Sequence, residues 1–152
     1  MTNQNKNKFL IIGYGNSLRN DDQVGQIIAQ KIEIEALPQV KCIYQHQLTP
    51  ELAEKIAIFS NIIFIDACVD NNEVTTILLP RSAINNKCEY GHYCTPEYLL
   101  YLTKLIHNQY PKSYLITIPV NNIDLGEELS DLAKEGIKIA LKIIKEIINK
   151  IE

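Results

Sequence analysis

Apolar runs alternate along the chain with amphipathic stretches, and this alternation predicts an α/β fold. The run "NIIFIDAC" is apolar enough to be a strand buried on both faces, whereas "VKCIYQHQL" alternates apolar and polar residues as a half-buried or edge strand does. The predicted strands are residues 9–15, 40–48, 61–68, 75–80 and 113–120. We expect the first, third and fourth to be fully buried, with Pro80 ending the fourth.

Four helices are predicted from apolar residues at helical spacing, over 26–37, 49–59, 95–107 and from Ser130 to the end. Thr49 and Thr95 are each followed by Pro and Glu, which are favoured at the N-cap and in the first helical turn. The last helix has a continuous apolar stripe formed by Ala133, Ile137, Ala140, Leu141, Ile144, Ile147, Ile148 and Ile151.

This order of elements predicts a single-domain, three-layer α/β/α fold with a mostly parallel, twisted sheet of about five strands flanked by helices. The 152 residues suffice for one hydrophobic core. We expect one domain over 1–152, with residues 1–7 as a flexible tail. In sheets of this kind, ligands bind beyond the carboxyl ends of the strands.

The composition is ordinary for a globular protein, with 46% hydrophobic and 22% charged residues. A net charge of −3 gives no electrostatic reason to expect a nucleic-acid partner. The polar N-terminus lacks a signal-peptide core, and no apolar run reaches the length of a membrane helix. We therefore expect a cytoplasmic monomer without a membrane partner, with its four cysteines reduced.

Candidate chemistry gathers at the predicted carboxyl ends of the strands. Asp21 and Asp22 follow the first strand, Asp66 ends the third apolar run, and His92 precedes the helix that starts at Thr95. One of the adjacent aspartates can cap the following helix, but only one is needed for that. Two carboxylates and an imidazole are suitable ligands for zinc, nickel or a similar ion, and three protein ligands leave positions open for water or substrate.

Other motifs give weaker signals. Gly13 and Gly15 fit a dinucleotide fingerprint, but Leu18 stands where the third glycine belongs. Cys88, His92 and Cys94 lack the C-x-x-C pair typical of a thiolate metal site. A phosphoacceptor receiver domain is disfavoured because the last strand lacks a lysine at its end.

The segment "GYGNSLRNDDQVG" resembles the N-terminal signature of the nickel-iron hydrogenase maturation endopeptidases. The blocks "QLTPELAEKI", "NIIFIDA", "GHYCTPEYLL" and "DLGEELS" resemble later blocks of that family, in the same order, so that the resemblance covers nearly the whole chain. The first two blocks are most similar to members that serve bidirectional, NAD-linked hydrogenases.

This resemblance implies a twisted sheet between helices and an endopeptidase that removes a C-terminal extension from the nickel-loaded precursor of the hydrogenase large subunit. The family's metal-binding residues correspond here to Asp22, Asp66 and His92. Nickel would be carried by the precursor, and another divalent ion could occupy the site in isolation. Asp21 is a candidate general base.

Two residues depart from the family pattern, because Gln23 replaces a glycine and Asp22 replaces a glutamate found in many members. The alternatives are a catalytically inactive, metal-checking or metallochaperone-like binding module of the same fold, and a free-standing amidohydrolase with its own metal.

Overall fold

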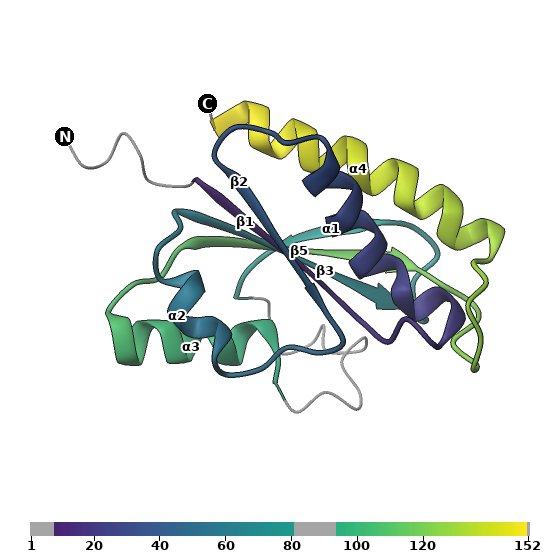
Figure 1. Cartoon of the computed structure of the whole chain (residues 1–152), viewed down its shortest axis with the longest axis horizontal. Helices are drawn as coiled ribbons and strands as arrows, with labels where there is room; N and C mark the ends of the chain where they lie inside the picture. Colours follow the sequence, from purple (N-terminus) through teal and green to yellow (C-terminus); the bar gives the residue numbers. More distant parts are fainter. Residues whose placement is uncertain (1–7, 81–93, 152) are drawn as a thin grey trace.

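A five-stranded sheet forms the centre of the molecule (Figure 1). The structure is a computed structural model, and it describes residues 8–80 and 94–151. The strand order is β2-β1-β3-β5-β4. Neighbours among the first four strands in this order are parallel, and β4 is antiparallel to β5. The strands are β1 (Phe9–Tyr14), β2 (Val40–Gln45), β3 (Asn61–Cys68), β4 (Thr75–Leu78) and β5 (Lys112–Pro119). This arrangement confirms the predicted α/β class and mostly parallel sheet.

Helices cover both faces of the sheet (Figure 1). The helices are α1 (Val24–Ile34), α2 (Leu52–Ile56), α3 (Pro96–His107) and α4 (Asp131–Ile151), and a 3-10 turn, η2 (Asn20–Gln23), precedes α1. Helices α1 and α4 share one core with one face of the sheet, and α2 and α3 share a second core with the other face. Each helix places an apolar stripe on the sheet, which removes that surface from water and stabilises the three layers.

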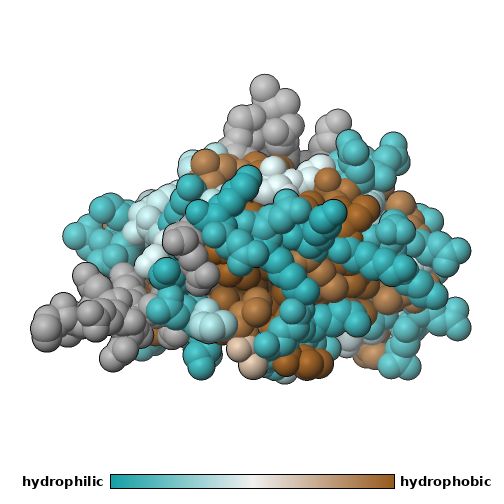
Figure 2. Space-filling model, turned by 90° about the horizontal axis from the view of Figure 1, so that it is seen from above, coloured by the Kyte–Doolittle hydropathy of each residue, from teal (hydrophilic) through white to brown (hydrophobic). Residues whose placement is uncertain are grey.

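The longest helix, α4, follows its predicted stripe. Ala133, Ala140 and Ile144 are fully buried, whereas Lys138 and Lys142 are exposed. Seen from the side of α4, hydrophilic side chains surround hydrophobic ones, as expected for an amphipathic helix at a surface (Figure 2). No helix in the described part of the chain is long and apolar enough to cross a membrane.

Two glycines explain how α1 packs on β1. A Cβ atom on Gly13 would lie 1.9 Å from the carbonyl oxygen of Gly25, and one on Gly25 would lie 2.6 Å from the carbonyl oxygen of Ile65. No side chain fits in either place, so glycine at these positions allows the helix and the sheet to approach closely. As a result, α1 begins directly beside the end of β1.

Three sequence expectations need correction. The predicted fourth strand, β4, is only half-buried, because it is an edge strand with a single neighbour. The helix predicted from Thr49 starts at Leu52, because the N–H groups of Leu52 and Ala53 bond three residues back and form tight turns. Cys42 and Cys94 are free, but Cys68 is disulfide-bonded. The expectation of four reduced cysteines rested on the cellular compartment, which does not show which thiols the fold brings together.

Candidate active site at the carboxyl ends of β1 and β3

The two predicted acidic segments lie at the same edge of the sheet. β1 and β3 are neighbouring parallel strands, and Gly13 is in register with Ile65. The next residue of β3 is Asp66, while β1 continues into the loop that carries Asp21 and Asp22. β2 lies on one side of β1 and β3 lies on the other, so the direction in which successive strands are added reverses at β1. Open α/β sheets bind ligands at the carboxyl edge beside such a reversal.

Asp22 is half-buried in the turn before α1. Its Oδ2 accepts a hydrogen bond of 2.8 Å from the backbone N–H of Asn16, and its own N–H donates to the carbonyl oxygen of Arg19. The side chain of Asn16 in turn accepts a bond of 2.9 Å from the N–H of Leu18. This loop therefore fixes the backbone around Asp22 and leaves its carboxylate partly open to solvent.

Asp21 has different surroundings from its neighbour. It is completely buried, and its carboxylate accepts four hydrogen bonds. Three come from the backbone N–H groups of Asn121, Asn122 and Ser130, and the fourth, of 2.6 Å, comes from the Ser130 hydroxyl. Bonds to an ionised acceptor are stronger than neutral ones, so Asp21 holds the segment after β5 in place.

Ser130 links Asp21 to the last helix. Its Oγ accepts the N–H of Ala133 at 3.1 Å, which is the N-cap bond of α4. The start of this helix is thus joined through one hydroxyl to a carboxylate on the first loop. The sequence indicated the helix start at Ser130, but its pairing with Asp21 has no local signal because the two residues are 109 positions apart.

We use the name paired loops for residues 15–23 and 121–130, which lie side by side before α1 and α4 (Figure 1). Asn20 connects them at its backbone and at both side-chain atoms. Its N–H bonds the carbonyl oxygen of Gly126, its Nδ2 bonds that of Asp124, and its Oδ1 accepts the N–H of Glu128. Asn20 adopts a φ of +46°, which asparagine tolerates better than most residues.

Gln23 stands where the family that the sequence resembles has a glycine, and it fits the turn without strain. Its φ and ψ are −81° and −4°, an ordinary right-handed conformation open to any residue. Its amide donates to the carbonyl oxygen of Glu127 at 3.2 Å. This position does not require glycine, and the glutamine adds a further bond between the paired loops.

Asp66 is buried near the carboxyl end of β3, with 3% of its surface exposed. Its Oδ1 accepts the N–H of Ala67 at 2.8 Å. It is in register with Thr117 of β5, whose hydroxyl bonds that of Thr75 and accepts the amide of Asn71 at 3.1 Å. A row of polar groups thus crosses three strands beside this carboxylate, on the face covered by α2 and α3.

His92 lies outside the described residues, so the third predicted ligand is not placed. Within 8–80 and 94–151, no three His, Cys, Asp or Glu side chains form a group that could hold a metal ion. Asp22 and Asp66 supply two oxygen donors at one edge, a partial set that suits a divalent ion with nitrogen or oxygen ligands. Burial raises the pKa of the Cys94 thiol, and the Glu51 carboxylate adds to the shift, which disfavours a thiolate ligand there.

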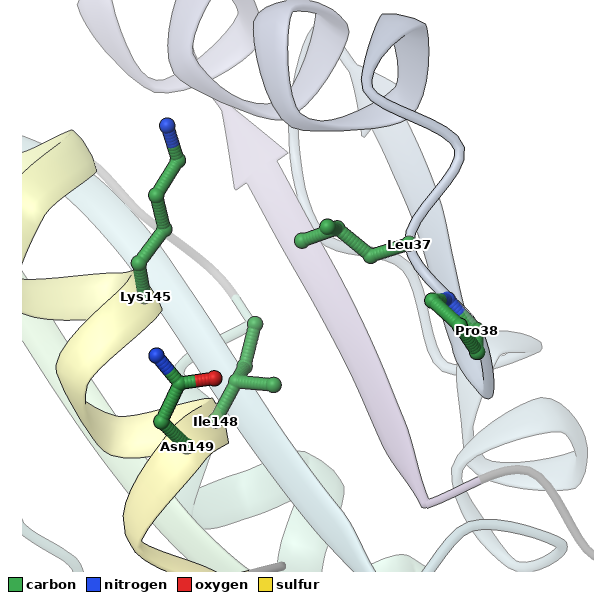
Figure 3. A pocket seen from close by; sticks show the side chains of 5 residues that line it. All are labelled: Leu37, Pro38, Lys145, Ile148 and Asn149. Carbon is green, nitrogen blue, oxygen red and sulfur yellow. The ribbon is translucent and has the colours of Figure 1, made fainter.

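A small pocket lies at the opposite end of the sheet, before β2 and beneath the end of α4 (Figure 3). It has a volume of about 170 Å³ and is lined by Leu37, Pro38, Lys145, Ile148 and Asn149. Leu37 points across it toward α4 (Figure 3). At its rim, Lys145 forms an ion pair of 2.9 Å with Glu35.

No family model and no curated protein sequence matches the chain, but solved structures match its fold. The NiFe hydrogenase maturation protease HybD from Thermococcus kodakarensis is 23% identical, with a TM-score of 0.74 over 92% of this chain and 98% of that one. The maturation protease HycI from the same organism is 24% identical, with a TM-score of 0.72 over 95% and 94%. The hydrogenase maturating endopeptidase HybD from E. coli is 17% identical, with a TM-score of 0.70 over 94% and 93%.

Proposed function

We propose that this protein, which shares the fold of the NiFe hydrogenase maturation proteases, is an endopeptidase of that kind. It would remove the C-terminal extension of the hydrogenase large-subunit precursor after nickel insertion. The observation that carries the proposal is the placement of Asp22 and Asp66 at the adjacent carboxyl ends of β1 and β3, where this fold binds ligands.

In this proposal Asp22, Asp66 and His92 bind the nickel ion that the precursor carries. Nickel is then part of the substrate, and a precursor without it lacks the group that these residues recognise. A metal ion can polarise the scissile carbonyl group or lower the pKa of a water molecule. Asp66 is buried, and the N–H of Ala67 donates to its Oδ1, which restricts the orientation of the carboxylate.

Asp21 has a positioning role in this proposal. A general base must reach the proton that it removes, whereas Asp21 is buried and accepts four hydrogen bonds from its own chain. The carboxylate therefore stabilises the loop that presents Asp22. The base role that the sequence suggested for Asp21 is tested by comparing Asp21→Asn with Asp22→Asn.

The test is intact-mass spectrometry of a nickel-loaded large-subunit precursor before and after addition of the protein, beside a nickel-free precursor. Loss of a short C-terminal peptide from the loaded form alone is the expected result. A precursor that binds the protein and keeps its mass would instead identify an inactive binding module. Cleavage of both forms would contradict recognition of nickel, and a tightly bound metal in the purified protein would favour an amidohydrolase with its own ion.

We propose that the protein acts as a monomer in the cytoplasm. Each helix of the described chain buries an apolar stripe against the sheet, which supports a monomer, while Leu105 and Ile106 on the outer side of α3 stay exposed. Analytical ultracentrifugation tests the monomer, and a dimer at micromolar concentration would contradict it. The hydrogenase subgroup, suggested as bidirectional and NAD-linked, is tested by offering precursors of both kinds.

A further inference from the structure

Two leucines on the paired loops are exposed at the candidate active site. Leu18 is 58% exposed and Leu125 is 77% exposed, whereas the other apolar side chains of the second loop, Ile123 and Leu129, pack against the core. Single exposed leucines are common on protein surfaces. These two differ because they occupy equivalent positions on adjoining loops, and both lie close in the chain or across the loops to the turn that carries Asp22.

The register of the paired loops places the two leucines next to each other. Arg19 and Gly126 form a parallel β-bridge, and Leu18 and Leu125 each come one residue before it. The N–H of Gly126 donates to the carbonyl oxygen of Leu18 at 2.8 Å. This hydrogen bond brings the backbones of the two exposed leucines together at the bridge, and we call these two residues the leucine pair.

The backbone beneath the leucine pair is firmly held. Asn20 and Asp21 bond the second loop at several points, and none of these bonds involves a leucine side chain. The apolar side chains are consequently presented on a preorganised support, which lowers the entropy lost when a partner binds. Removing either side chain leaves every one of these hydrogen bonds intact.

Exposed carboxylates flank Leu125 along the chain. The exposed carboxylates on the second loop and at the start of α4 are Asp124, Glu127, Glu128 and Asp131. Arg19 is the basic residue within the paired loops. A ligand for this surface therefore combines an apolar side chain, which covers the leucines, with flanking Lys or Arg residues that complement the carboxylates.

We infer that the leucine pair is a docking site for a segment of the precursor in which an apolar residue is flanked by basic ones. This inference rests on the proposed function and adds to it how the polypeptide itself is recognised. The metal-facing residues would select the loaded state of the precursor, and the leucine pair would bind the chain near the bond to be cut. Recognition of the metal and recognition of the polypeptide are then separate, and substitutions can remove one without the other.

The experiment measures kcat and KM for processing of the nickel-loaded precursor encoded in the same genome. The variants are Leu18→Ala, Leu125→Ala and the double substitution, and the matched control is Leu105→Ala. Leu105 is 65% exposed on α3, near the opposite end of the sheet. We expect each single variant to raise KM about tenfold and the double variant about a hundredfold, with kcat unchanged, because the contact contributes equally to ground-state and transition-state binding.

Charge is tested separately. Asp124→Asn and Glu127→Gln should raise KM and make it less sensitive to salt, since complementary surface charges are screened by ions. Unchanged thermal unfolding of every variant would exclude a general loss of structure.

The outcomes distinguish the inference from the function on which it rests. If the wild-type protein cleaves the precursor and the double variant keeps the same KM, the leucine pair is not a docking site, while the proposed function stands. If the wild-type protein cleaves nothing, both fail. If ultracentrifugation shows a dimer that the double variant loses, the occupant is a second copy of this chain and the inference is overturned.

Discussion

The two ends of the sheet use polar groups in different ways. At the carboxyl end, Asn20 and Asp21 join segments more than 100 residues apart, and almost all of their bonding groups are engaged. At the amino end, Ser113 bonds the carbonyl group of Pro111 two residues away, Asn61 bonds that of Lys8 just before the neighbouring strand, and the pocket under α4 is mainly apolar. Both ends bury polar side chains, but at the carboxyl end they form a network of several bonds between two loops.

This difference shows where geometry is specified most closely. An apolar contact tolerates small shifts, whereas a charge-assisted network fixes the positions of its members. The carboxyl end of the sheet therefore holds the turn around Asp22 on a rigid base, which is the arrangement that the proposed site needs. The amino end serves packing, and the following predictions test the contrast.

The largest effect is expected for Asp22→Ala and Asp66→Ala, which should abolish precursor processing and leave the fold intact; His92→Ala should impair it strongly. Under the proposed function, each variant loses a group that contacts the substrate metal. Processing is followed by intact mass and folding by circular dichroism. Asp70→Ala is the matched control, because Asp70 is an exposed carboxylate only four residues beyond Asp66. Full processing by both aspartate variants would show that the site lies elsewhere.

Asp21→Ala should lower the free energy of unfolding by about 3 kcal/mol, because it leaves three part-buried N–H groups and the Ser130 hydroxyl without their acceptor. Asp22→Ala, which removes one acceptor in a half-buried turn, should cost about 1 kcal/mol. Urea denaturation of both variants measures the difference. Equal destabilisation would mean that the two adjacent carboxylates do not have separate roles.

Gly126→Ala should destabilise the protein by about 1–3 kcal/mol, because this residue has a φ of +150° and a Cβ would lie 2.3 Å from Oδ1 of Asn20. The double variant with Asn20→Ala separates the causes. If the clash with Asn20 contributes, the two substitutions together should cost less than the sum of the single ones. If the two free-energy changes simply add, the destabilisation by Gly126→Ala comes from the backbone conformation of residue 126 alone.

Lys145→Ala, at the amino end, should change the free energy of unfolding by less than about 1 kcal/mol, since its ion pair with Glu35 is 44% and 37% exposed. Processing should be unaffected. The measurement is again urea denaturation, repeated at high salt, where the small difference should shrink further. A loss of processing would connect the pocket under α4 to function and remove the contrast between the two ends.

Much of the fold follows from local pattern. The buried strand at 61–68, the N-cap at Thr95 and the stripe of α4 were predicted from periodicity and capping chemistry, and the Thr95 hydroxyl does accept the N–H of Tyr98 at 3.0 Å. The half-buried state of β4 and its antiparallel direction were missed. These depend on which strand lies beside it, and a short apolar run contains no information about its neighbour.

The site was predictable only in part. The rule that ligands bind beyond the strand ends indicated Asp21, Asp22 and Asp66, but it did not distinguish the two adjacent aspartates. Their difference arises from Asn121, Asn122 and Ser130, which reach Asp21 from the far end of the sequence. The metal-ligand set, including His92, stays a prediction.

The bond between Asp21 and Ser130 has a consequence for synthesis on the ribosome. The loop that presents Asp22 gains its support only when Ser130 and the first turn of α4 have left the exit tunnel, so until then the nascent chain holds its acidic pair without the partners that order it. Chains truncated before α4 would therefore lack this ordered loop.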